Sequence, residues 1–219
     1  MNLLRILLFV AAPVLVFGQS SSLGSLAVSS SDTPGPITAK ERVRWVMEST
    51  VGPASLAGGL FSAGWGTLFN VPREYGTHWD GYGKRYGMRL TGIATSNVME
   101  AGLGAMWGED PRYIRAAGAP FGTRVGQILK MTFLAQNSDG KLKPAYARYI
   151  AISGNNFLSN TWRADSEATN SRATIRIGLG FLGRMGGNTF EEFWPDVRQR
   201  FFSRSKPQTP SVQRTVDPN

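Results

Sequence analysis

Residues 51–71 read VGPASLAGGLFSAGWGTLFNV, and this stretch without a charged side chain decides how the fold is predicted. Its small residues recur every four positions, at Ala54, Gly58, Ser62 and Gly66. A second series lies beside them and consists of Ser55, Gly59, Ala63 and Thr67. Because residues four apart share one face of a helix, the spacing predicts a helix with two adjacent ridges of small side chains. Such ridges let a neighbouring helix approach closely, which offsets the roughly 1 kcal/mol that a helical glycine costs relative to alanine.

The rest of the core has helical spacing as well. Thr38 followed by Glu41 is a capping-box pattern, which predicts a helix start. Gly83 and Gly87 repeat the small-residue spacing in a second segment, beside a stripe of aromatic residues. Apolar residues recur at intervals of three and four elsewhere, and the alternation typical of strands is missing. We therefore predict an all-α fold, a glycine-rich bundle of about six helices packed through small-residue ridges.

The N-terminal residues 1–18 predict a signal peptide. Arg5 is followed by an apolar run from Ile6 to Phe17, the order of charge and apolar core that secretory signals have. The run is shorter than the roughly 20 apolar residues that a membrane span needs, although an uncleaved anchor remains an alternative. The protein is therefore expected to be exported, to the periplasm or the cell envelope.

Polar, proline-containing segments flank the core on both sides. Residues 19–36 are rich in serine, and residues 203–219 contain three prolines and few apolar side chains. Neither segment can bury enough apolar surface to offset the entropy lost on ordering, so we predict a disordered linker and a disordered tail. Residues 37–202 remain as one helical domain.

Composition excludes several classes of function. The chain has no cysteine, which excludes disulfides, thiolate zinc sites and a lipid anchor at the cleavage site. The formal net charge is +9, with the basic residues spread along the chain. Because an exported protein seldom meets nucleic acid, anionic lipid headgroups or envelope polymers are the expected partners. A basic surface that only aids solubility is the alternative.

The motifs that resemble catalytic or cofactor sites are incomplete. Residues 178–183 match G-x-G-x-x-G, but too little chain follows for a dinucleotide-binding fold, so these glycines are expected to pack against a helix. His78 is the single histidine and has no nucleophile motif to work with. The sequence therefore predicts no catalytic residue, no metal site and no cofactor.

Glu100 lies in an apolar stretch and is expected to be buried in a polar pair. Arg89, eleven residues earlier on the same helix face, is the first candidate partner. Arg176 and Arg184 on other helices are further candidates. A structural pair is favoured over a functional proton site, because buried pairs are common without function.

Adjacent acids occur twice. Asp110 precedes a proline and is interpreted as a helix cap, and Glu191 and Glu192 as charges in the first turn of a short closing helix that Pro195 interrupts. The alternative is an envelope hydrolase that uses Glu100, Glu109 or Asp110, with two carboxylates placed across a cleft. That alternative requires the acids to converge and their pKa values to be raised.

The segment 79–87, WDGYGKRYG, interleaves aromatic and basic residues. Such a mixture is typical of contacts with lipid headgroups or a polyanion. The residues expected to make this contact are Trp79, Tyr82, Lys84, Arg85 and Tyr86. In the alternative, the aromatic side chains pack inward and the two basic ones are solvated.

Three strings carry a resemblance: GYGKRYG at 81–87, EDPRY at 109–113 and EFWPD at 192–196. Together they resemble an uncharacterised family of exported bacterial proteins, over about residues 40–200. The resemblance implies export and a single domain, and it implies no catalytic residue.

These observations favour an exported cell-envelope protein with a structural or interaction role, associated with a membrane through residues 51–71. Its expected partner is membrane lipid or another envelope protein, and a homo-oligomer is left open. The alternatives are the carboxylate hydrolase and a helical carrier of an apolar ligand, which would need an enclosed apolar pocket.

Overall fold

The structure, a computed structural model, describes residues 35–202. The predicted signal peptide, the predicted tail and nearly all of the predicted linker lie outside the described residues. The helices are α2 (Ala39–Val51), α3 (Pro53–Leu68), α4 (Trp79–Trp107), α5 (Phe121–Phe133), α6 (Tyr146–Leu158) and α7 (Asn170–Phe202), with 3-10 turns η1 (Arg73–Tyr75) and η2 (Ser159–Thr161). The strands are β1 (Glu109–Asp110), β2 (Leu134–Asn137) and β3 (Leu142–Pro144). The predicted helical class is confirmed at this level, and the small sheet is an addition to it.

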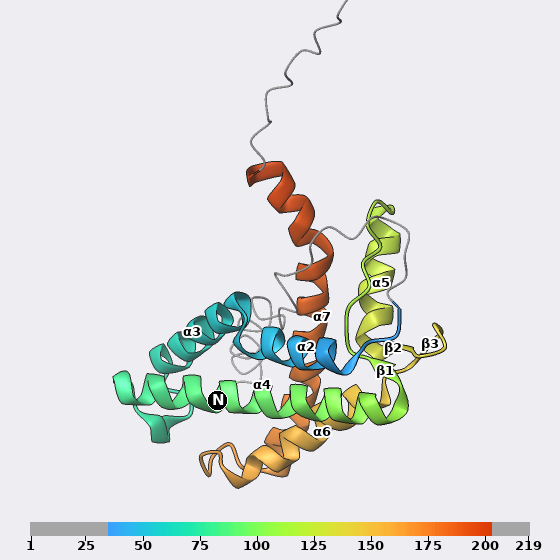
Figure 1. Cartoon of the computed structure of the whole chain (residues 1–219). Coiled ribbons are helices and arrows are strands. Elements are labelled where there is room, and N and C mark those ends of the chain that lie inside the picture. Colours follow the sequence, from blue (N-terminus) through green and yellow to red (C-terminus); the bar gives the residue numbers. More distant parts are fainter. Residues whose placement is uncertain (1–34, 203–219) are drawn as a thin grey trace, which may run out of the picture.

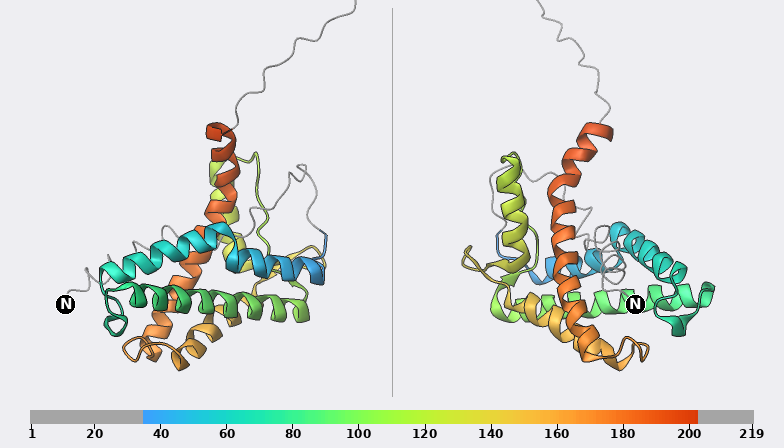
Figure 2. Two further views of the ribbon diagram at one scale, coloured as in Figure 1. Left: turned by 60° about the vertical axis from the view of Figure 1, so that its left-hand side comes forward. Right: turned by 180° about the vertical axis from the view of Figure 1, so that it is seen from behind.

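Helix α4 is the axis of the arrangement (Figure 1). Helices α2 and α3 pack on one side of α4, and α6 packs on another. Helix α7 crosses α6, and its C-terminal half extends away from α4 beside α5 (Figure 2). The antiparallel sheet, in the order β1-β2-β3, joins the end of α4 to the start of α6.

Helix ends follow from local sequence. The predicted capping box is confirmed: the Thr38 backbone N–H donates to Glu41 Oε2 at 2.8 Å, and the Glu41 N–H donates to Thr38 Oγ1 at 3.3 Å. Gly108 ends α4 with φ +73°, a left-handed conformation that favours glycine. This turn sends the chain directly into β1 and thereby positions Glu109.

The small residues of α3 make room for large side chains of α4. Ser55 and Ala63 are buried, and a Cβ added to Gly59 would lie 2.7 Å from the ring of Tyr86. A Cβ on Gly66 would lie 3.0 Å from Arg85 Cδ. The ridges predict that two helix backbones come into contact. Here the small residues instead leave space for the side chains of Tyr86 and Arg85.

The predicted ridge residues have different surroundings. Gly58 is buried and Ser62 is half-buried, whereas the side chain of Ala54 lies outside the described residues. Gly83 and Gly87 are exposed, and a Cβ added to either would meet no atom within 4 Å. Their assignment to a packed ridge is wrong, because α3 contacts another face of α4, the one that carries Tyr82, Arg85 and Tyr86.

Two glycines of α4 offer a matched test of this packing. A Cβ on Gly81 would lie 2.1 Å from the carbonyl oxygen of Tyr75, so Gly81→Ala forces the backbone apart and should lower the free energy of unfolding by about 1–3 kcal/mol. Gly83→Ala fills open space and should raise it by about 0.5–1 kcal/mol. Urea unfolding of both variants measures the difference. Equal losses in the two variants would mean that the Gly83 face of α4 is covered.

No helix within residues 35–202 is both long enough and apolar enough to cross a bilayer. Helix α3, which contains most of the charge-free stretch, is 16 residues long.

Candidate functional site

Glu100 is the centre of a buried ionic cluster that joins three helices. Its Oε1 accepts hydrogen bonds from Arg148 Nε at 2.9 Å and Arg184 Nη2 at 3.4 Å, and all three residues are buried. Arg148 also donates to the carbonyl oxygens of Met131 and Thr132, at 2.6 and 3.1 Å. Burial lowers the pKa of Arg184 to about 10, which leaves it charged at neutral pH. The cluster holds α4, α6 and α7 together.

Arg89 is not the partner of Glu100. The two residues are eleven apart on α4, which separates them by about 16 Å along the helix axis. Arg89 instead donates to the carbonyl oxygen of Ser55 at 3.2 Å. Of the other two candidates, Arg184 is a partner, whereas Arg176 donates to Asn156, Asn160 and Glu167.

A second buried carboxylate joins α5, α7 and the loop between β1 and α5. Glu192 is completely buried and accepts from Arg124 Nε at 2.7 Å, from the Tyr113 hydroxyl at 2.9 Å and from the Ala116 N–H at 3.1 Å. Burial and this carboxylate raise the pKa of the Tyr113 phenol. The prediction of a first-turn helix charge is wrong here, because α7 runs unbroken from Asn170 through Pro195.

Asp110 and Glu109 have separate roles. Asp110 accepts from the Arg112 backbone N–H at 2.9 Å and from its guanidinium at 2.6–3.1 Å. The next helix, α5, begins only at Phe121, so the helix-cap interpretation is wrong. Glu109 Oε2 accepts from the N–H of Ala147 at 3.0 Å, in the first turn of α6. Burial raises the pKa of Glu109, and the backbone donors of α6 oppose that change.

The three acids of the hydrolase alternative therefore have three different sets of partners. Glu100 is held by arginines in the core, Asp110 is held by Arg112, and Glu109 alone among the three lines the pocket described below. A pair of carboxylates facing each other across one cleft is not formed by these residues.

The aromatic and basic segment is divided between the interior and the surface. Arg85 is buried and donates to the carbonyl oxygens of Val71, Pro72 and Gly76 at 2.7–2.8 Å. It therefore orders the loop between α3 and α4 instead of reaching a lipid headgroup. Tyr86 packs on α3, and the Tyr82 hydroxyl donates to the Leu60 carbonyl oxygen. In contrast, Trp79 is 85% exposed, and Lys84 is exposed with Asp80 at 3.8 Å.

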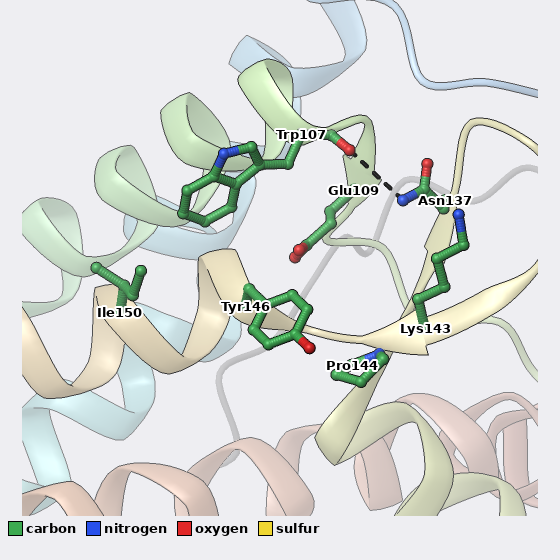
Figure 3. Close-up of a pocket in the computed structure, with 7 residues that line it drawn as sticks. All are labelled: Trp107, Glu109, Asn137, Lys143, Pro144, Tyr146 and Ile150. Carbon is green, nitrogen blue, oxygen red and sulfur yellow. Dashed lines mark hydrogen bonds between the residues drawn. The ribbon is translucent and has the colours of Figure 1, made fainter.

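A pocket of about 420 Å³ lies where the end of α4, the sheet and the start of α6 meet (Figure 3). It is lined by Trp107, Glu109, Asn137, Lys143, Pro144, Tyr146 and Ile150. Trp107, Tyr146 and Ile150 are themselves exposed, so this is not the enclosed apolar cavity that the carrier alternative needs. The sequence did not predict this pocket: Trp107 and Glu109 are close in the chain, but the other lining residues lie at positions 137–150.

Large apolar side chains cover much of the surface. Among the most exposed are Val43 on α2, Leu68 on α3, Met106 on α4 and Phe121 on α5. By contrast, the largest fully buried side chains are Arg148, Met131, Glu192, Asn97, Thr132, Ser49 and Ser159. The usual distribution of polar and apolar groups is thus partly inverted.

Among residues 35–202, no group of three or more His, Cys, Asp or Glu side chains could hold a metal ion.

Comparison with family models, with curated proteins and with solved structures finds no match for this chain.

Proposed function

We propose that the protein is an exported component of the cell envelope with an interaction role, and that it binds the surface of a membrane. The single observation behind this proposal is the partly inverted distribution of side chains. Arg148 and Glu192 lie in the interior, while Trp79, Met106 and Leu68 lie outside. Exposed apolar area on this scale is typical of surfaces that contact a partner or a membrane.

Helix α2 is the element best suited to lie in the lipid interface. Val43, Met47 and Val51 are four residues apart and all exposed, so they form one apolar stripe. Lys40 and Arg44 lie beside that stripe and are exposed as well, and Glu48, which pairs with Arg44 at 2.6 Å, lies one turn further along the same row. An apolar row next to a basic row is the pattern of helices that bind anionic bilayers in the plane of the interface.

A flotation assay with anionic vesicles tests this role. The purified protein should float with vesicles that contain phosphatidylglycerol, and high salt should weaken the binding because Lys40 and Arg44 contribute. Met47→Glu should lower the partition coefficient about tenfold or more, since burying one methionine contributes roughly 1.5–3 kcal/mol.

Leu142→Glu is the matched control, because it places the same charge at an exposed apolar position on β3. It should leave partitioning within about twofold. If the unaltered protein does not float with the vesicles, the proposal is wrong. If both variants lose vesicle binding equally, α2 is not the contact.

A further inference from the structure

We propose that the pocket between α4, the sheet and α6 binds an organic ammonium ion, with Trp107 and Tyr146 as aromatic walls and Glu109 as the counter-charge. This site does not depend on the membrane role proposed above. Its ligand class follows from the chemistry of the lining.

The lining side chains converge on one space. Figure 3 shows the carboxylate of Glu109 directed between the indole of Trp107 and the ring of Tyr146, with Ile150 on a further side. Glu109 is 5% exposed, and the backbone N–H of Ala147 fixes its Oε2. A carboxylate has about four acceptor positions, so capacity for a ligand donor remains beside the backbone donors.

The charge distribution favours a cation. The faces of aromatic rings are negative and attract ammonium groups, most strongly those of tryptophan. A carboxylate at the back of the pocket adds attraction for a cation and repels an anion. Lys143 also lines the pocket, but its Nζ pairs with Asp139 at 2.8 Å, and Figure 3 shows its ammonium directed away from the two rings.

The ligand is organic and not a metal ion. Calcium takes six to eight oxygen ligands, whereas one carboxylate and two rings suit a cation with an apolar shell. A volume of about 420 Å³ has room for a substituted ammonium group. Such a group occurs both in free small molecules and in zwitterionic lipid headgroups, and the two sources share this chemistry.

Calorimetric titration with choline chloride tests the site, because choline is a free quaternary ammonium ion. Choline should bind, while its uncharged analogue 3,3-dimethylbutanol should bind at least tenfold more weakly. Trp107→Leu should weaken choline binding about tenfold, and Glu109→Gln should weaken it by a similar factor. Trp79→Leu removes an exposed tryptophan outside the pocket lining and should leave the affinity unchanged.

Three results would overturn the proposal: no choline binding, equal binding of the uncharged analogue, or equal effects of Trp107→Leu and Trp79→Leu. If Glu109→Gln does not fold, Trp107→Leu and the uncharged analogue still decide. Vesicles of phosphatidylcholine identify the source. Competition between these vesicles and free choline supports a lipid headgroup, and choline binding without competition supports a free ligand.

The pH dependence provides a further readout. A bound cation favours ionised Glu109, so choline affinity should fall as the pH drops through the pKa of this carboxyl. Burial and neighbouring Glu100 raise that pKa, whereas Arg148 and the backbone donors of α6 lower it. The other charged or titratable groups around Glu109 are Arg42, Lys143 and Tyr146. In Glu109→Gln the drop in affinity over this range should disappear.

Discussion

Glu100→Ala is expected to lower the free energy of unfolding by about 3–5 kcal/mol. The substitution leaves Arg148 and Arg184 charged and buried, at 1% and 4% exposure, without their shared carboxylate. Removing one partner of a buried ion pair is far more costly than the pair itself is stabilising, because the remaining charge has lost its hydration as well. Urea unfolding followed by circular dichroism at pH 7 measures the loss.

Two comparisons make the Glu100 result specific. Glu48→Ala breaks the exposed pair with Arg44 on α2 and should cost at most about 0.5 kcal/mol. The triple variant Glu100→Leu, Arg148→Met, Arg184→Met removes every charge of the cluster and should recover much of the lost stability. A loss below about 1 kcal/mol for Glu100→Ala would contradict the proposed importance of the cluster.

Glu192→Ala is expected to have the second large effect, a loss of about 3 kcal/mol. It removes the acceptor of Arg124, of the Tyr113 hydroxyl and of the Ala116 N–H together. Because Arg124 keeps a contact with Asp196 at 2.6 Å, the loss should be smaller than for Glu100. Hydrogen exchange should rise in α5 and in residues 111–119, and it should stay unchanged in α2 and α3.

Asp196→Ala is the control for Glu192, because it removes the half-exposed acceptor of the same arginine. An exposed partner contributes little, so the expected loss is at most about 1 kcal/mol. If Asp196→Ala and Glu192→Ala destabilise equally, burial is not the reason for the effect of Glu192.

The sequence predicted local features better than pairings. The helix start at Thr38 depends on residues three apart, and the burial of Glu100 is visible in its apolar surroundings. The partners of Glu100 follow it by 48 and 84 residues, and no local pattern connects them. The strands β1 and β3 are two and three residues long, too short for alternation to be recognised.

Spacing also could not decide which small residues are packed. Gly59 and Gly83 belong to equally regular series, yet one contacts Tyr86 and the other faces open space. Periodicity defines a face of a helix, but the neighbour that covers it is set by the whole fold. In α7, the predicted interruption at Pro195 is absent; Phe190 and Trp194 stack there at 5.0 Å, and Glu192 fixes the segment to α5.

Charges in the interior also determine how strictly the helices are aligned. Methyl groups can exchange neighbours at small cost when two helices slide past each other, but Arg148 cannot. A slide of one helical turn would move its guanidinium about 5.4 Å from Glu100. Both charges would then be unpaired in the protein interior, which does not solvate them. Misaligned assemblies of α4 and α6 are therefore heavily penalised, so one alignment persists even though many large apolar side chains face outward.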